Sequence, residues 1–507
     1  MIELDFTEIS DIIKNRMDKI DLNSKGEEVG LVIESSDGIA RIDGLPNAMV
    51  GEMIAFENNV YGIIFNLELD RVVAVVLGPD NAVTTGTLAK STGRIMEVPV
   101  GPELLGRVVN AIGEPIDGKG EVKSKAFRPV ETLPPGVVDR SPVDQPLQTG
   151  YLTIDGLIPI GRGQRELIIG DRQTGKTTLA IDTIINQKGQ DVICIYVSIG
   201  KKSASLVEVV TTLQKNDAMD YTIVVDASAD DPGAMQFLAP FSGTAMAEEF
   251  MHVHKKDVLI IYDDLTKHAD SYRMLSLLLQ RPPGREAFPG DVFYLHSRLL
   301  ERSAKLSEAL GGASITALPI IETQKGDIST YIPTNVISIT DGQIFLQTNL
   351  FHSGFRPAIN AGISVSRVGG KAQVEAIRKL SGKLRLQLAR YREKESFTAF
   401  ASELDDETQA QLKEGQILIE ILKQNKHVPY SVEEQVVCIY LATAGHLNQL
   451  DISEIKNAQK FILDKFKSEY NSILVDLKKS DFKLPKDMLD RLDNAVKTSV
   501  IAYNQAK

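Results

Sequence analysis

Gly170-Asp-Arg-Gln-Thr-Gly-Lys-Thr177 follows the apolar run Leu167–Ile169 and fits the pattern G-x-x-x-x-G-K-[ST]. The pattern predicts a strand, a glycine-rich loop whose backbone N–H groups surround phosphate, and a helix that begins near Lys176 with its positive dipole end toward the anion. In such a loop the lysine reaches the β- and γ-phosphates, and the hydroxyl of Thr177 ligates Mg²⁺. We therefore expect a site for ATP or ADP with Mg²⁺, formed by Gly170, Asp171, Arg172, Gln173, Thr174, Gly175, Lys176 and Thr177.

Val258-Leu-Ile-Ile-Tyr-Asp263 has the pattern of a buried strand that ends in a carboxylate. Beside a phosphate loop, such a carboxylate accepts a hydrogen bond from a water bound to Mg²⁺. The pattern therefore predicts that Asp263 binds the metal through water. Asp264 is the competing candidate, but side chains alternate along a strand, so one of the two must point away from the site.

The composition is that of a folded protein without membrane spans. The chain has 507 residues, of which 43% are hydrophobic and 24% charged, and its length predicts roughly three domains. The net charge of -12 disfavours a surface that holds nucleic acid or anionic lipid by charge alone. No apolar run approaches the ~20 residues needed to cross a bilayer, and no secretory signal opens the chain. We therefore expect the protein in the cytosol or on its face of a membrane.

Hydrophobic spacing separates two segments at the start of the chain. Residues 1–25 place apolar side chains three and four positions apart, which predicts an amphipathic helix that docks on a partner chain or packs on its own domain. Residues 26–92 contain short runs of β-forming residues separated by turns, which predicts a small closed β-barrel. The runs are Glu28–Ile33, Gly38–Ile42, Met53–Phe56, Tyr61–Phe65 and Val72–Leu77.

Residues 93–372 alternate strand and helix patterns, as in a parallel sheet covered on both faces. Turn formers are dense from Gly93 to Gly150, above all over residues 113–150, which predicts an extended connector on the surface. Proline and glycine exclude helix and inner strand from residues 281–290, which form an ordinary loop or a stiff bearing surface. Residues 373–507 have helical spacing throughout. The expected central strands are Glu166–Ile169, Val192–Val197, Tyr221–Val225, Val258–Ile261 and Ser314–Ile321.

Four stretches resemble the α-subunit family of F-type ATP synthases: the phosphate loop, Leu259–Leu265, Gln280–Arg298 and Arg356–Arg367. The resemblance covers nearly the whole chain. It implies a multidomain fold with an N-terminal β-barrel, a central α/β RecA-like nucleotide-binding domain and a C-terminal helical domain. It also implies a ring of alternating α and β subunits around a rotating stalk, with catalytic sites chiefly on β and regulatory nucleotide sites chiefly on α. ATP synthesis in this family is coupled to a transmembrane gradient of H⁺ or Na⁺.

The same resemblance implies the partners and the location. The β subunit would flank this chain in the ring, the γ subunit of the central stalk would meet the loop 281–290, and the δ subunit or peripheral stalk would meet the helix 1–20. Nucleic acid is not among the implied partners, and the membrane sector is met only through the complex. The implied location is peripheral, at the cytoplasmic face of a bacterial cell membrane.

Family positions also mark individual residues. Arg367 matches the arginine finger, which reaches a neighbouring subunit and is worth about 10³–10⁵ in rate in related systems. Ser364 matches a position linked to activity, through placement of its segment. Lys426 falls where the family usually has Gln, which leaves base selectivity open. The surroundings of the bound nucleotide are matched by Gln173, Arg356, Pro357 and, near the base, Gln424.

Lys201 departs from the family. In this class of ATPase, the carboxylate that orients the attacking water follows the strand here predicted at Val192–Val197. The chain instead continues Ser-Ile-Gly-Lys201-Lys202, where α subunits usually have Gln at the first lysine. An ammonium is not a base at neutral pH unless its pKa is strongly perturbed, although it could pair with the γ-phosphate. We therefore expect nucleotide binding without hydrolysis by the chain alone.

Two alternatives remain open at this point. One is a subunit of a paralogous rotary-type ATPase with another mechanical task. The other is a self-sufficient hexameric export ATPase or helicase, which would need a carboxylate at the place of Lys201 and, for a helicase, a basic groove.

Overall fold

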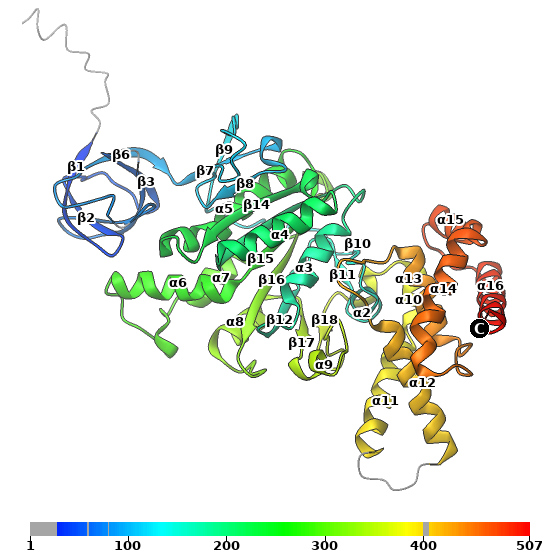
Figure 1. Ribbon diagram of the computed structural model, residues 1–507. Helices are drawn as coiled ribbons and strands as arrows, with labels where there is room; N and C mark the ends of the chain where they lie inside the picture. The colour runs from blue at the N-terminus through cyan, green and yellow to red at the C-terminus, as the bar shows by residue number, and fades with distance from the viewer. Residues whose placement is uncertain (1–27, 58–59, 80, 399–404, 507) are drawn as a thin grey trace, which may run out of the picture. The chain divides into compact units, whose positions relative to one another are not determined.

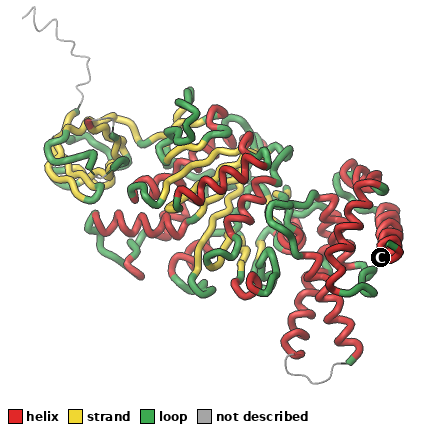
Figure 2. The backbone as a smooth tube through the Cα atoms, viewed as in Figure 1, coloured by secondary structure: helices red, strands yellow, loops and turns green. Residues whose placement is uncertain are grey.

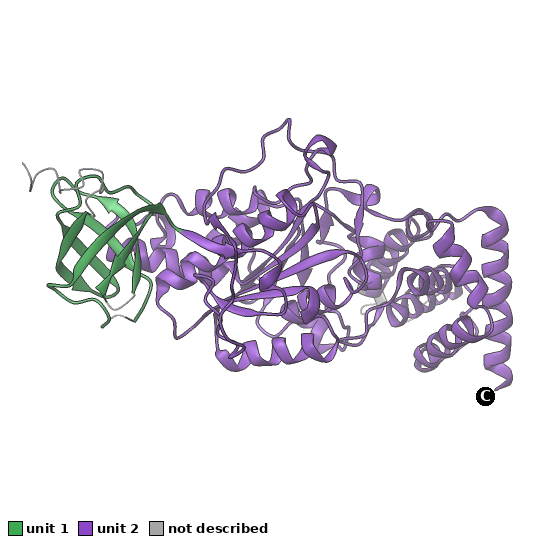
Figure 3. Cartoon of the chain, turned by 90° about the horizontal axis from the view of Figure 1, so that it is seen from above, with its two compact units in different colours: residues 1–96 green, residues 97–507 purple. Residues whose placement is uncertain are grey.

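The computed structural model describes residues 28–57, 60–79, 81–398 and 405–506. The predicted helix over residues 1–25, with its proposed contact at 1–20, lies outside the described residues. The chain divides into two compact units, residues 1–96 and 97–507 (Figure 3). Each unit is described by itself.

The first unit is a closed antiparallel barrel with the strand order β1-β2-β5-β4-β3-β6, in which β1 also pairs with β6. Its interior is filled by alternate side chains such as Val32, Ile54 and Ile64, each fully buried. The five strands predicted from sequence are confirmed. The sixth, β6, was missed because four of its eight residues are polar and its apolar residues do not alternate with them. The strands are β1 (Val29–Ser36), β2 (Ile39–Asp43), β3 (Glu52–Phe56), β4 (Tyr61–Leu67), β5 (Val72–Val76) and β6 (Leu88–Ile95).

The second unit is built on an eight-stranded sheet with the order β18-β17-β12-β16-β15-β13-β14-β8 (Figure 1). All neighbouring strands are parallel except β17 and β18. The five predicted central strands are confirmed as β12 to β16. The strands of this sheet are β8 (Val108–Asn110), β12 (Leu167–Asp171), β13 (Val192–Lys201), β14 (Thr222–Ser228), β15 (Asp257–Asp263), β16 (Ile315–Thr323), β17 (Gly342–Leu346) and β18 (Val365–Ser366).

Helices cover both faces of this sheet because both faces of its strands are apolar (Figure 2). On one face, Cys194 of β13 shares a core with Leu179 of α3 and Val209 of α4. On the other, Val197 of β13 packs so close to Gly243 of α5 that a Cβ there would lie 2.5 Å from it. The helices are α2 (Leu152–Leu157), α3 (Lys176–Ile185), α4 (Ser203–Lys215), α5 (Gly233–His252), α6 (Leu265–Leu278), α7 (Val292–Leu300), α8 (Tyr331–Ile339) and α9 (Thr348–His352).

The predicted surface connector from Gly93 to Gly150 is partly wrong. Its residues form β8 at the edge of the large sheet and two small ladders, and Val98, Val109 and Leu147 are buried. Strand pairing satisfies the backbone N–H and C=O groups of this turn-rich segment, and runs of two to four residues are too short to show a period. The ladders pair β7 (Glu97–Val100) with β9 (Ala126–Pro129), and β10 (Pro146–Leu147) with β11 (Ile160–Gly161).

The loop 281–290 also differs from the prediction in one detail. It contains a single 3₁₀ turn at Arg285–Ala287, where no helix was expected. Proline and glycine exclude a longer helix, but the three residues between Gly284 and Phe288 can close one turn. Other 3₁₀ turns lie at Pro102–Leu104, Met219–Tyr221, Glu308–Leu310, Gly369–Ala372 and Ile452–Glu454.

The chain ends in a helical domain, as predicted. Its core contains Leu418, Ile439, Ile462 and Phe466, and it is continuous with the core beneath α2. Among the described residues, no helix combines the length and apolarity needed to cross a bilayer. The helices are α10 (Glu375–Ser381), α11 (Leu384–Thr398), α12 (Asp406–Leu422), α13 (Val432–Thr443), α14 (Ile455–Ser468), α15 (Asn471–Lys479) and α16 (Lys486–Gln505).

Candidate nucleotide-binding site

The phosphate loop joins the end of β12 to the start of α3, and its two glycines are required by geometry. A Cβ on Gly170 would lie 2.5 Å from the carbonyl oxygen of Leu346 on the neighbouring strand β17. Gly175 caps α3 with a φ of 98°, a left-handed conformation that side chains disfavour. The glycines therefore let the chain turn tightly at the helix N-terminus, where backbone N–H groups are available to an anion.

Lys176 lies inside this loop. Its ammonium donates hydrogen bonds to the carbonyl oxygens of Gly170 at 2.8 Å and Asp171 at 2.5 Å. Burial lowers the pKa of Lys176, against the opposing pull of Glu322, Asp264 and Asp263. A positive charge is thus held within the loop, close to the backbone that would surround phosphate.

Asp171 fixes the shape of the loop. Its carboxylate accepts hydrogen bonds from the hydroxyls of Thr323 at 2.7 Å and Thr348 at 2.8 Å, and from the N–H of Gly326 at 2.8 Å. Burial alone would raise the pKa of Asp171, but these bonds outweigh it and lower the pKa. Thr174 donates to the carbonyl oxygen of Asp171 at 2.8 Å. Asp171 thus attaches the loop to Thr323 of β16 and Thr348 of α9, and Thr174 bonds the backbone within the loop.

The two residues between them point outward. Arg172 is exposed and pairs with Glu322 at the end of β16. Gln173 is also exposed, with a φ of 60°. Their side chains are therefore accessible, whereas Thr174 and Lys176 hold the loop backbone by hydrogen bonds.

Asp263 and Thr177 are brought together at the carboxyl ends of β15 and β12. The hydroxyl of Thr177 donates to Asp263 at 2.8 Å, and the hydroxyl of Tyr196 donates to the same carboxylate oxygen at 2.7 Å. The ammonium of Lys201 forms an ion pair with that oxygen and lies 3.0 Å from the hydroxyl of Thr177. Lys201 therefore contacts both predicted metal-binding side chains.

Asp264 takes a different role from Asp263. It caps α6, where its carboxylate accepts a hydrogen bond from the N–H of Lys267 at 2.8 Å. Burial, and then the neighbouring charge of Asp263, raise the pKa of Asp264 to about 6. The two carboxylates therefore have different hydrogen-bond partners, and β15 ends at Asp263, before Asp264.

The residues predicted around the base come from two distant segments that meet. The N–H of Gln424 donates to the carbonyl oxygen of Arg356 at 2.7 Å, and its side-chain amide donates to the carbonyl oxygens of Gly150 at 2.7 Å and Val428 at 2.8 Å. The guanidinium of Arg356 lies over the ring of Phe351, and the bond from Arg356 to Pro357 is cis. Lys426 is exposed.

The loop that carries Gln424 is fastened to the helix that follows the phosphate loop. His427 contacts Asp182 of α3 with its ring nitrogen Nδ1 at 2.7 Å and with its backbone N–H at 3.0 Å. Tyr151 donates to the same carboxylate. The helical domain thereby contributes its α12–α13 loop to the surroundings of the phosphate loop.

Ser364 and Arg367 lie apart from the phosphate loop. Ser364 is buried; its hydroxyl donates to the carbonyl oxygen of Asn360 at 2.7 Å and accepts from the N–H of Phe345 at 2.9 Å. Arg367 is exposed, and its N–H donates to the carbonyl oxygen of Asp341 at 2.8 Å. Ser364 thus attaches to β17 the segment that presents Arg367.

Several residues of this site were not predicted from the sequence. Tyr196 and Glu322 contact the predicted site residues Asp263 and Arg172. Asp182 contacts His427, in the loop that carries Gln424. A polar or acidic side chain that recurs within an apolar strand or helix is the available signal, since buried polar groups need partners. That signal does not say which partner, because the contacts span 67 to 245 residues.

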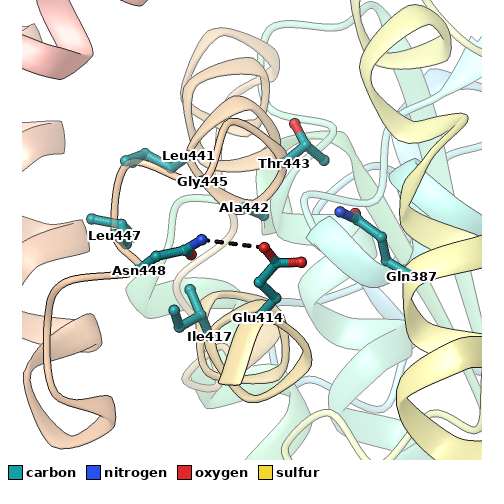
Figure 4. A pocket seen from close by; sticks show the side chains of 9 residues that line it. All are labelled: Gln387, Glu414, Ile417, Leu441, Ala442, Thr443, Gly445, Leu447 and Asn448. Atoms are coloured by element: carbon teal, nitrogen blue, oxygen red, sulfur yellow. Dashed lines mark hydrogen bonds between the residues drawn. The ribbon is translucent and has the colours of Figure 1, made fainter. Parts of the chain in front are cut away.

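A cleft also lies in the helical domain, between α11, α12 and α13 (Figure 4). Asn448 donates to Glu414 across it at 3.2 Å, and Gln387 faces it from α11. None of its lining residues belongs to the phosphate loop. Its contents are one carboxylate and neutral side chains, so it does not offer the cations that a nucleotide phosphate needs.

Known protein families match the barrel, the nucleotide-binding region and the helical domain of this chain. The beta-barrel domain of the ATP synthase alpha/beta family matches residues 27–93, its nucleotide-binding domain matches 150–366, and its C-terminal domain matches 373–499. The chain is 57% identical over 474 residues to a sodium-ion-specific ATP synthase subunit alpha of Acetobacterium woodii, covering 94% of each chain. It is 56% identical to the ATP synthase subunits alpha of Acetivibrio thermocellus, covering 92% of each chain, and Lactobacillus johnsonii, covering 97%.

Proposed function

The chain belongs to the ATP synthase alpha/beta family and is a component of an ATP synthase or ATPase complex, in which we propose that it is a largely non-catalytic α-type subunit. It binds ATP or ADP at the loop Gly170–Thr177. It also supplies Arg367 to the catalytic site of a neighbouring β-type subunit. Thr177 and, through water, Asp263 occupy the positions at which this class of site holds Mg²⁺.

The observation that carries the non-catalytic assignment is the state of the carboxylates at the phosphate loop. Asp263 is paired with Lys201 and hydrogen-bonded to Thr177, and Asp264 caps α6. Glu322 pairs with Arg172. Each of these acids is engaged, while the end of β13, where a water-orienting carboxylate is needed, carries Lys201.

The position of Arg367 favours action on another subunit. β18 pairs with the start of β17 through Ser366 and Gly342, whereas Gly170 is opposite Leu346 at the end of β17. Four residues of extended strand separate these points by about 13 Å. Arg367 and the chain's own phosphate loop therefore lie at opposite ends of neighbouring strands, and the exposed guanidinium is available to a partner.

The remaining assignments follow from the family. We propose a ring in which this chain alternates with β-type subunits and meets the central stalk through the loop 281–290. The peripheral stalk would meet residues 1–20. The complex would couple ATP synthesis to a transmembrane gradient of H⁺ or Na⁺ at the cytoplasmic face of a bacterial membrane, with this chain peripheral.

The test measures ATP binding and hydrolysis in one sample of the purified full-length chain, then adds the β-type partner. We expect binding without turnover by the chain alone and hydrolysis only after the partner is added. Replacing Arg367 by Ala should abolish most of that hydrolysis without changing binding to the chain alone.

Other outcomes would identify the alternatives. Sustained hydrolysis by the chain alone would indicate a self-sufficient ATPase with a different base. A complex that hydrolyses ATP but never couples to an ion gradient when joined to its membrane sector would indicate a paralogue with another mechanical task. Absence of nucleotide binding would refute the proposed site.

A further inference from the structure

The ammonium of Lys201 lies where the proposed site would be expected to hold a divalent cation. It pairs with the carboxylate of Asp263 and is 3.0 Å from the hydroxyl of Thr177. A hydroxyl at the start of the phosphate-loop helix and a carboxylate at the end of a neighbouring strand are the side chains that hold Mg²⁺ in this class of site. Lys201 therefore places one positive charge in contact with both of these groups, which are also hydrogen-bonded to each other.

The local fold holds the ammonium there. β13 carries a bulge between Ile199 and Lys201, and Gly200 within it has a φ of 60°, which redirects the strand end. Tyr196 lies five residues earlier in β13, and its hydroxyl is 3.5 Å from the ammonium and donates to Asp263. The side chain of Lys201 is 19% exposed and that of Asp263 is 3% exposed, so water screens the pair poorly.

The next residue provides a contrast. Lys202 precedes α4 and is exposed. The two adjacent lysines therefore differ in setting: one is fixed against the metal-binding side chains and the other faces solvent. Any effect of Lys201 that comes from mere positive charge near the loop should be shared by Lys202, whereas an effect of its contacts should not.

Thr177 and Asp263 offer the kind of oxygen atoms that bind Mg²⁺, but the ammonium of Lys201 already contacts both. A divalent ion at Thr177 and Asp263 would have to displace the ammonium or lie against a like charge. An ammonium, in contrast, donates hydrogen bonds to phosphate oxygens and neutralises their charge without needing a coordination shell. Together with Lys176, it would give the site two fixed cations for a polyphosphate.

We infer that Lys201 acts as a tethered cation in place of Mg²⁺, so that this chain binds the polyphosphate of ATP or ADP with little dependence on divalent ions. The inference rests on the proposed nucleotide site. It assigns Lys201 to binding and gives a physical reason why the site would hold nucleotide without hydrolysing it: a monovalent donor lacks the charge and the coordination that a metal gives to phosphoryl transfer.

The test is equilibrium binding of ATP and of ADP to the full-length chain, by calorimetry, once with excess EDTA and once with Mg²⁺. For the natural chain we expect the two affinities to agree within about threefold. In Lys201→Gln, removal of the charge should weaken binding in EDTA by about tenfold or more and restore a Mg²⁺ dependence of similar size. Lys202→Gln is the matched control and should behave as the natural chain.

A second readout follows the metal directly. Electron paramagnetic resonance of Mn²⁺ with the nucleotide-loaded chain should detect little bound Mn²⁺ in the natural protein and a bound ion in Lys201→Gln. Lys201→Arg, which keeps the charge, should resemble the natural chain more closely than the Gln variant does. Thermal unfolding of each variant establishes that it is folded.

The outcomes separate this inference from the function on which it rests. If the natural chain binds nucleotide but gains tenfold or more from Mg²⁺, and Lys201→Gln gains equally, the ammonium moves aside for the metal and the inference is wrong, while the nucleotide site stands. If the natural chain binds no nucleotide in either condition, both the site and the inference are wrong.

Discussion

The two ends of the central sheet carry the two parts of the proposed function, nucleotide binding at one end and Arg367 at the other. The end that holds the phosphate loop has a buried lysine, one carboxylate paired with Lys201 and another that caps α6. The end near β18 has an exposed guanidinium held by its backbone, and a buried hydroxyl behind it. One end can hold a nucleotide but offers no base; the other offers a cation but no phosphate loop.

This difference indicates that holding a nucleotide and assisting its cleavage are separable properties of one fold. The first needs backbone geometry and positive charge, which Gly170, Gly175 and Lys176 provide locally. The second needs a positive charge at the phosphate of a nucleotide bound to the neighbouring subunit, which an exposed Arg367 can provide across the subunit boundary. A variant at the phosphate loop should therefore change nucleotide binding by this chain, and a variant at Arg367 should change hydrolysis by the neighbouring subunit.

The largest effect is expected at Arg367. In the assembled complex, Arg367→Ala should lower the rate of ATP hydrolysis by about 10³-fold or more, because the charge that develops on the phosphoryl group loses its partner. Arg367→Lys should recover only a small part, since an ammonium lacks the planar fork of guanidinium. Steady-state hydrolysis by the complex is the measurement.

The control for Arg367 is Lys371→Ala, which removes a nearby exposed cation. This variant should keep its activity. Nucleotide binding to the isolated chain should also be unchanged in Arg367→Ala. A parallel loss of binding to the chain's own loop would contradict the separation of the two ends.

The second largest effect is expected at Lys176. Lys176→Gln should weaken nucleotide binding to the isolated chain by about 100-fold, because a charged hydrogen-bond donor to phosphate is lost from a buried position. Equilibrium binding measures it. Lys188→Gln, which removes an exposed lysine paired with Asp217 beyond the end of α3, should have no such effect. If hydrolysis by the complex fell as far as it does for Arg367→Ala, the two ends of the sheet would not have separate roles.

The third effect is a loss of folding stability at acid pH, and we expect it first at the end of the sheet that holds the phosphate loop. His268 of α6 and His296 of α7 are fully buried with ring centroids 5.4 Å apart. Burial lowers the pKa of His296 to about 4 and that of His268 well below its ordinary value. α6 begins at Asp264, directly after the strand that carries Asp263, so loosening it would disturb this end of the sheet first.

The sign follows from the proton balance. Between pH 6.5 and 4 the unfolded chain binds a proton at His296 that the folded chain refuses, so stability is full above pH 6.5 and falls as the pH drops. From pH 7.5 to pH 5 the loss from His296 should be about 2 kcal/mol. Urea unfolding at both pH values measures it. In His296→Phe this part of the loss should disappear; an unchanged acid loss would contradict the role of the buried imidazole.

What could be predicted from sequence depended on the distance over which each feature is encoded. The phosphate loop and the strand ending at Asp263 were predicted because eight or fewer consecutive residues specify them. β6 was missed because its polar side chains show no period, and β8 because three residues are too few. Strand adjacency was also not encoded locally, so the pairing of Lys201 with Asp263, 62 positions later in the chain, could not be foreseen.

The smallest effect is expected at Ser364, which joins the two ends of the comparison through β17. Ser364 lies three residues before Arg367, and its hydroxyl accepts from the buried N–H of Phe345 and donates to the carbonyl oxygen of Asn360. Ser364→Ala leaves that N–H unpaired, which should cost about 1 kcal/mol of folding stability and lower hydrolysis by the complex several-fold through displacement of Arg367.

Because β17 also borders Gly170, nucleotide binding to the isolated chain is the discriminating measurement. Unchanged binding with reduced hydrolysis would place the effect at the arginine end, and Ser364→Thr, which keeps the hydroxyl, should recover part of the rate. Equal losses of binding and hydrolysis would show instead that β17 transmits the disturbance along its length, and that the two ends of the sheet are mechanically one.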